Sequence, residues 1–150
     1  MAFVLYVKQA YIKDGIVTSN TKFKGKILVV EDHEDMRDLA VDILANEGFK
    51  VITAGDAISG LEQFKRHFDV DLVFTDLILP GGASGIDMAK KILEINPRTQ
   101  ILLTSGYRAK GEALKYKTAK LPNISYVPKP YDVDELLQII YSLIGKAAFQ

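Results

Sequence analysis

Side chains able to hold a metal ion or a phosphoryl group follow four short apolar runs of the sequence. Glu31 and Asp32 follow the first run, Asp76 ends the second, Ser105 the third, and Lys129 comes shortly after the fourth. Each run has the length and composition of a buried strand. Ligands of open parallel sheets bind beyond the carboxyl ends of the strands. We therefore expect these carboxylates, this hydroxyl and this ammonium to gather at one edge of a sheet.

Such a group of acids implies a divalent cation. Three carboxylates a few ångströms apart repel one another and raise each other's pKa. Mg²⁺ (or Mn²⁺) removes that conflict, since hard cations prefer carboxylate and carbonyl oxygens. The expected metal ligands are Glu31, Asp32, Asp76 and the backbone carbonyl of Ile78. With the metal bound, Asp76 could attack a phosphoryl group as a nucleophile. Lys129 and Ser105 would then meet the charge on the transferring oxygens.

The segments that must position these groups alternate between two sequence patterns. Short runs rich in β-branched residues predict strands, and stretches with apolar residues three and four apart predict amphipathic helices. The predicted strands are 27–30, 51–54, 71–76, 101–104 and 124–127, and the helical faces lie in 36–44, 57–68, 86–93 and 136–144. This alternation indicates an α/β fold, with helices on both faces of a parallel sheet. The periodicity of 108–121 is too weak to decide whether that segment is helical.

Composition narrows the class of protein. The chain has 150 residues, nearly half of them apolar, which is typical of one domain with a sizeable core. Nineteen basic and nineteen acidic residues cancel, which argues against nucleic-acid binding by bulk charge. The absence of cysteine excludes disulfides and thiolate chemistry. No apolar run approaches the roughly 20 residues of a membrane span, so we expect a soluble, cytoplasmic protein.

Residues 1–24 differ from the rest of the chain. They show no clean period, and Asp14 with Gly15 is typical of a turn. We expect an N-terminal extension or linker over 1–24 and one domain over 25–150. The extension could be an extra strand, a linker from a larger protein, or added sequence.

Taken in order, the motifs resemble the receiver domains of response regulators in two-component systems, over about residues 26–145. The matching positions are the acidic pair Glu31 and Asp32, the acceptor Asp76 with Pro80 four residues later, Ser105 with the small Gly106, the aromatic Tyr126, and the pair Lys129 and Pro130. Each motif alone is weak. Five motifs in the right order, each near a strand end, make the resemblance specific.

The resemblance implies a flavodoxin-like, doubly wound sheet of strand order 2-1-3-4-5 and a cis peptide before Pro130. It implies transfer of a phosphoryl group onto Asp76 from the phosphohistidine of a histidine kinase or a histidine phosphotransfer protein. Ser105 and Tyr126 would form the conformational switch. Such a domain is no conventional enzyme, although it catalyses its own Mg²⁺-dependent phosphorylation and dephosphorylation. Neither nucleic acid nor a membrane would be a direct partner of this chain.

Two features are similar to the receivers of hybrid sensor kinases. The loop after Pro80 is one residue longer than the common form, and Ser105 lies in the run from Thr104 to Tyr107. The chain could therefore be tethered to a kinase in its full-length protein.

Other interpretations stay open at this point. An aspartate-nucleophile phosphatase would need a general acid two positions after Asp76, where Ile78 stands. A receiver-shaped interaction module would not be phosphorylated at all. A nucleotide-binding Rossmann domain would need a glycine-rich turn after its first strand, where this chain has acids. Thr104 competes with Ser105 as the reactive hydroxyl, and His33 could be either a surface residue or a metal ligand.

Overall fold

A five-stranded parallel sheet forms the centre of the molecule. The computed structural model describes residues 11–13, 16–18, 23–106, 121 and 123–148. The strands of this sheet are β3 (Lys26–Val30), β4 (Lys50–Ala54), β5 (Leu72–Asp76), β6 (Gln100–Ser105) and β7 (Ile124–Pro128). Their spatial order is β4-β3-β5-β6-β7, with every neighbouring pair parallel. Numbered along the chain within this sheet, that is the predicted order 2-1-3-4-5, and the fold-class prediction is confirmed.

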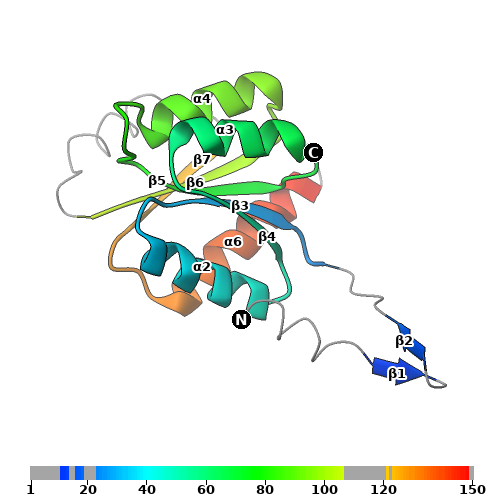
Figure 1. Cartoon of the computed structure of the whole chain (residues 1–150). Coiled ribbons are helices and arrows are strands. Elements are labelled where there is room, and N and C mark those ends of the chain that lie inside the picture. Colours follow the sequence, from blue (N-terminus) through cyan, green and yellow to red (C-terminus); the bar gives the residue numbers. More distant parts are fainter. Residues whose placement is uncertain (1–10, 14–15, 19–22, 107–120, 122, 149–150) are drawn as a thin grey trace.

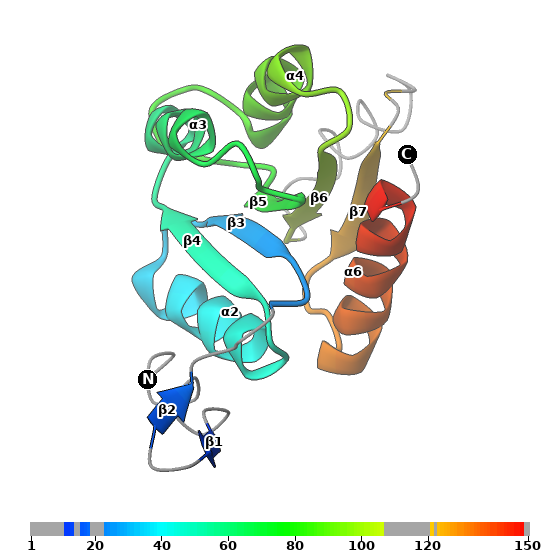
Figure 2. The ribbon, with the colours of Figure 1, turned by 90° about the vertical axis from the view of Figure 1, so that its right-hand side faces the viewer.

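Helices cover both faces of the sheet (Figures 1 and 2). The helices in the described part of the chain are α2 (Glu34–Asn46), α3 (Ala57–Arg66), α4 (Gly85–Ile95) and α6 (Val133–Ala148). Helices α2 and α6 pack on one face, and α3 and α4 pack on the other. Any helix within 108–121 falls almost wholly outside the described residues. None of the described helices is long and apolar enough to cross a membrane.

The central strand β3 explains why its sequence is apolar without interruption. Ile27 and Val29 lie in the core beneath α2 and α6, whereas Leu28 and Val30 lie in the core beneath α3 and α4. All four side chains are at most 1% exposed. Burying such a side chain contributes about 1.5–3 kcal/mol. A strand buried on both faces therefore needs apolar residues at every position, not at every second one.

Three predicted core positions are wrong. Phe68 was expected on the apolar face of the second helix, but α3 ends at Arg66 and Phe68 is 78% exposed. The chain turns there to enter β5, and Val70, 4% exposed, takes the buried position. Met36 and Leu39 have the correct helical spacing in α2 yet are 38% and 51% exposed. A period of three and four residues gives the direction of a side chain around a helix. It gives neither the end of the helix nor the width of the surface that covers it.

Helix α3 begins with a well-formed cap, which makes its stability depend on pH. The Asp56 carboxylate accepts the backbone N–H of Ser59 at 2.7 Å, and the Asp56 N–H donates back to the Ser59 hydroxyl. The backbone N–H of Ser59, together with the Ser59 hydroxyl, which donates to the same carboxylate oxygen at 2.8 Å, holds the pKa of Asp56 below its usual value of 3.8. We expect Asp56→Ala to lower the free energy of unfolding by about 1 kcal/mol at neutral pH. Urea denaturation measures this change.

The sign of the pH dependence follows from that pKa. A group whose pKa is lowered by folding stabilises the protein above its unfolded pKa and loses this effect as the pH falls through the folded value. The difference in free energy of unfolding between wild type and Asp56→Ala should therefore disappear below about pH 3.8. Asp38→Ala, at an exposed position of α2, is the matched control and should lose no stability. If this difference in free energy of unfolding stays constant down to the lowest pH, the assignment of Asp56 as the cap is contradicted.

The N-terminal part of the chain contributes a separate small sheet. Strands β1 (Tyr11–Lys13) and β2 (Ile16–Thr18) pair with each other in antiparallel register. They are not part of the five-stranded sheet. The predicted turn at Asp14 and Gly15 falls between them, outside the described residues. The division of the chain near residue 24 remains a prediction.

Candidate functional site

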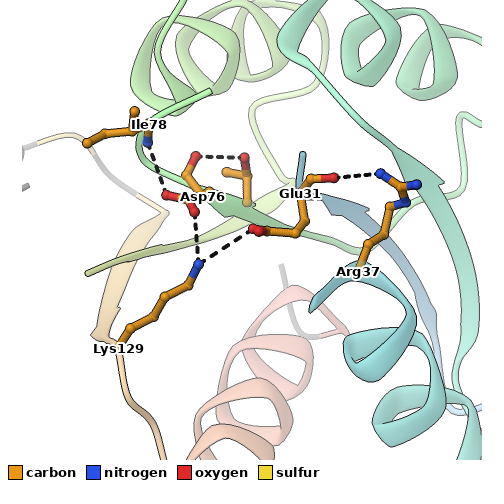
Figure 3. A network of polar contacts seen from close by, with 6 residues as sticks. Glu31, Arg37, Asp76, Ile78 and Lys129 are labelled. Atoms are coloured by element: carbon orange, nitrogen blue, oxygen red, sulfur yellow. Dashed lines mark hydrogen bonds and ion pairs between the residues drawn. The ribbon is translucent and has the colours of Figure 1, made fainter. Parts of the chain in front are cut away.

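The predicted chemical groups lie at one edge of the sheet, at the carboxyl ends of the strands. Glu31 directly follows β3, Asp76 is the last residue of β5, Ser105 is the last of β6, and Lys129 directly follows β7. The register pairs Asp76 with Thr104 across β5 and β6. Figure 3 shows the side chain of Lys129 reaching toward both Asp76 and Glu31. The peptide bond between Lys129 and Pro130 is cis, as expected from the resemblance.

Lys129 links the two acidic strand ends. Its Nζ donates to Asp76 Oδ2 at 2.9 Å and lies 3.6 Å from Glu31 Oε2. The three side chains are largely buried, with exposed fractions of 21% for Lys129, 13% for Asp76 and 8% for Glu31. Burial acts to lower the pKa of Lys129, but the hydrogen bond to Asp76 and the two negative charges outweigh it, so this pKa is raised. The ammonium therefore remains charged at neutral pH.

The surroundings of the Glu31 carboxylate favour the binding of a further positive charge next to it. Its burial raises the pKa of the carboxyl group. Lys129 opposes this rise, the charges of Asp76 and Asp32 add to it, and the backbone N–H of His33 opposes it more weakly. Glu31 Oε1 is buried and has no hydrogen-bond partner among the described residues. An unpaired buried carboxylate oxygen beside two other acids is what a cation site presents before a cation binds.

The acidic pair is accompanied by an imidazole. Glu31, Asp32 and His33 each offer one ligand atom, and these atoms all lie within 4.8 Å of one another. Asp76 is not part of that group and joins the site through Lys129. The expected carbonyl ligand, Ile78, approaches Asp76 with its backbone N–H, which donates to Asp76 Oδ1 at 3.1 Å. Coordination by its carbonyl stays a prediction.

The backbone beyond Asp76 is fixed by the start of α4. The Gly85 N–H donates to the carbonyl of Leu77 at 2.8 Å, and the Leu77 N–H donates to that of Thr104 at 2.8 Å. A Cβ built on Gly85 would collide with the backbone oxygen of Asp76. Sequence reasoning missed this contact, although a glycine at the first position of a helix, next to the capping Ser84, could have drawn attention to it.

A further contact missed from the sequence involves Arg37. Its guanidinium donates to the backbone carbonyl of Glu31 at 2.9 Å (Figure 3). This bond ties α2 to the loop that carries the acidic pair. No sequence signal marks it, because an arginine near a helix start is usually solvated.

Two hydroxyls lie close to the site and differ in their bonding. Ser105 Oγ and Tyr126 Oη form a hydrogen bond of 2.6 Å. Thr104 Oγ1 is buried with no partner among the described residues, and Thr104 lines the same small cavity as Asp76 and Lys129. The Ser105 to Tyr126 bond connects the two residues expected to form the switch.

A comparison with protein families identifies this arrangement. Residues 27–141 match the family model of the response regulator receiver domain. The chain belongs to the response regulator receiver family. Receiver domains are the phospho-accepting switches of two-component systems and interact with histidine kinases or phosphotransfer proteins. The family assignment made from the motifs is confirmed.

Curated relatives are similar to this receiver over most of its length. Sensory transduction protein RegX3 of Mycolicibacterium smegmatis is 34% identical over 122 residues, which are 81% of this chain and 51% of RegX3. Chemotaxis protein CheY of Treponema pallidum is 33% identical over 79% of this chain and 82% of its own. The receiver thus spans about half the length of RegX3 but most of the length of CheY.

Solved structures agree with the fold. A response regulator receiver domain protein from Clostridium thermocellum has a TM-score of 0.76 at 25% identity, over 83% of this chain and 98% of its own. The receiver of the hybrid histidine kinase CckA has a TM-score of 0.65 at 24% identity, over 80% of this chain and 99% of its own. At that identity the likeness concerns the fold alone. Attachment of this receiver to a kinase remains a prediction, and Tyr107 of the supporting motif lies outside the described residues.

Proposed function

We propose that Asp76 accepts a phosphoryl group from the phosphohistidine of a histidine kinase or a histidine phosphotransfer protein. The observation that carries this proposal is the position of Asp76 at the sheet edge. Its Oδ2 is bonded to Lys129 at 2.9 Å, and Lys129 also lies 3.6 Å from Glu31. A charged lysine beside a carboxylate nucleophile suits phosphoryl transfer, because catalysis of that reaction is mainly positioning and charge stabilisation.

The proposed reaction is a displacement at phosphorus. A carboxylate oxygen of Asp76 forms the new P–O bond as the P–N bond to the partner's imidazole breaks. The imidazole nitrogen of the partner keeps the electron pair of the broken bond. Lys129 meets the negative charge on the transferring oxygens from the position it already holds. Water attack on the acyl phosphate later returns the carboxylate and inorganic phosphate.

Mg²⁺, or Mn²⁺, would be the cofactor. The residues proposed to hold it are Glu31, Asp32, Asp76 and the backbone carbonyl of Ile78. The buried and unpartnered Oε1 of Glu31 supports this fit, as does the raised pKa that burial imposes on the same group. When bound, the ion supplies positive charge that lets several carboxylates and a phosphoryl group occupy one small region.

Phosphoryl uptake by Asp76→Asn is the direct test. The protein is incubated with Mg²⁺ and a small phosphodonor such as acetyl phosphate, and acid-labile phosphate is measured by intact mass. Wild type and Asp38→Asn, altered at an exposed position of α2, should gain one phosphoryl group. Asp76→Asn should gain none, since an amide is a far weaker nucleophile. Equal uptake by Asp76→Asn and wild type would refute the assignment.

Ser105 and Tyr126 are proposed to transmit the phosphorylated state. A phosphoryl group on Asp76 would draw the Ser105 hydroxyl toward it and break the 2.6 Å bond to Tyr126. Tyr126 would then shift, and the surface of β7 and α6 would change population. Ser105→Ala should slow phosphorylation by about tenfold or more, because one hydrogen-bond donor to the transition state is lost.

Thr104→Val is the matched variant for that experiment. It removes a buried hydroxyl that bonds to none of the residues the structure describes, so neither stability nor uptake should fall. Phosphorylation rates of the two variants in Mg²⁺ provide the comparison. A large loss of rate in Thr104→Val, with Ser105→Ala unaffected, would assign the reactive hydroxyl to Thr104 instead.

The proposal extends to the domain boundaries and the cellular location of this receiver. We assign residues 25–150 to the receiver and 1–24 to an extension. A cytoplasmic location fits the proposal, because histidine kinases draw on ATP of the cytoplasm.

A further inference from the structure

His33 occupies a helix-capping position without acting as a cap. It is the N-cap residue of α2, with φ −76° and ψ 116°, and its side chain makes no capping hydrogen bond. By contrast, the N-cap residues Asp56 and Ser84 both accept backbone N–H groups at the starts of α3 and α4. Since Ser, Thr, Asp and Asn are the usual caps, the imidazole of His33 is not explained by the helix it precedes.

The imidazole lies instead beside the acidic pair. Ligand atoms of Glu31, Asp32 and His33 lie within 4.8 Å of one another, and Asp32 and His33 are both exposed. Two ligand atoms on one Zn²⁺ are each about 2.1 Å from it, hence at most about 4.2 Å apart. Small rotations of two exposed side chains would be enough to bring the three ligand atoms to that spacing.

A second observation shows that this cluster is more than an exposed group of acids. Glu31 is only 6% exposed, and its Oε1 has no hydrogen-bond partner among the described residues. Its other oxygen faces Lys129 at 3.6 Å. A buried carboxylate oxygen without a partner costs free energy unless something binds it. Oε1 is therefore the atom that a cation approaching Asp32 and His33 would satisfy.

The donor set decides which cation. Mg²⁺ prefers oxygen ligands, whereas imidazole suits Zn²⁺, Co²⁺ and other first-row transition ions. We propose that His33 adds a nitrogen ligand to the acidic pair, so that this receiver binds Zn²⁺ more tightly than Mg²⁺ through Glu31, Asp32 and His33. This proposal rests on the metal site of the proposed function and changes its selectivity. A receiver of this kind would respond to transition metals as well as to its kinase.

Calorimetric titration of Zn²⁺ and Mg²⁺ tests the proposal on the full chain. His33→Asn removes the imidazole but supplies a preferred helix cap, so α2 should keep its start. His67→Asn is the matched control, because His33 and His67 are the only histidines and no cysteine competes for the metal. His33→Asn should lower the ratio of Zn²⁺ to Mg²⁺ affinity by at least about tenfold, and His67→Asn should leave it unchanged.

A second measurement uses the unmodified protein and so does not depend on how the variants fold. With only two imidazoles, Zn²⁺ should shift the ring ¹⁵N NMR signal of one histidine, His33, by direct coordination and leave that of His67 unchanged, and Mg²⁺ should shift neither. An unchanged affinity ratio in His33→Asn, or ring ¹⁵N signals of His33 that Zn²⁺ does not shift, overturns the proposal. Neither readout involves phosphoryl transfer. If the proposed function is wrong, this shows in a different experiment, as phosphate uptake by Asp76→Asn.

Discussion

Gly85→Ala should lower the free energy of unfolding by about 3 kcal/mol or more. The added methyl would occupy the space of the Asp76 backbone oxygen, and it would also press on the Cα of Leu77 at 3.2 Å. Both obstacles are backbone, which cannot rotate away as a flexible side chain can. Either α4 must move off the end of β5 or the hydrogen bond from Gly85 to Leu77 must break. Urea unfolding monitored by circular dichroism measures the loss.

Gly145→Ala provides a control of opposite sign. Gly145 lies within α6, and a Cβ there would meet none of the described atoms within 4 Å. Alanine at such a position should stabilise the protein by about 0.5–1 kcal/mol, because glycine loses more backbone entropy on folding. Equal effects of the two substitutions would show that helix propensity, and not the contact with Asp76, governs Gly85.

The same contact has a functional side. Any variant that shifts the start of α4 also shifts the backbone that carries the Asp76 carboxylate. We therefore expect Gly85→Ala, in the fraction that remains folded, to take up phosphate more slowly than wild type. Sub-ångström to ångström displacement of a nucleophile is enough to reduce rates strongly. The glycine is thus a positioning residue for the proposed acceptor.

The sequence predicted the fold and the residues at the sheet edge well, and for a physical reason. A strand buried on both faces must be continuously apolar, so the run before Glu31 could be recognised as β3 without knowledge of its neighbours. Parallel strands place their carboxyl ends at one edge, so Asp76 and Lys129 could be expected to meet across 53 residues of chain. Both inferences depend on topology and not on details of packing.

What the sequence did not predict depends on distances between elements. Three contacts were missed, and each is between segments whose distance is set by the packing of the whole core. They are the close approach of Gly85 to the Asp76 backbone, the bond from Arg37 to the Glu31 carbonyl, and the bond between Ser105 and Tyr126. A sequence pattern has a period and a face but no such distance. The exposed Phe68 was predicted to be buried for a different reason, because the helical period does not show that α3 ends at Arg66.

Lys129→Met should make the stability of this receiver strongly dependent on a divalent cation. Removing the ammonium leaves Asp76 and Glu31 largely buried, and no other cationic side chain of the described ranges forms an ion pair with either. Breaking a largely buried ion pair on one side leaves an uncompensated charge, at a cost of about 3 kcal/mol. In EDTA the variant should therefore unfold at a lower urea concentration than wild type.

Mg²⁺ should recover most of that loss. A ligand that binds only the folded state stabilises it by about 2.7 kcal/mol at 100 times its dissociation constant. Lys129→Met lacks the ammonium that neutralises Asp76 and Glu31. Its urea midpoint should therefore rise more on adding Mg²⁺ than the urea midpoint of wild type. Lys129→Arg, which keeps the charge, is the control and should respond as wild type does.

Glu31→Gln in the Lys129→Met background separates repulsion from lost packing. If clustered negative charge causes the instability, neutralising Glu31 should restore stability in EDTA and reduce the benefit of Mg²⁺, since one proposed ligand charge is gone. Lost packing of the lysine chain would leave the double variant as unstable as Lys129→Met. In that case Lys129 would be a structural residue at the sheet edge, and its part in charge stabilisation at Asp76 would need another basis.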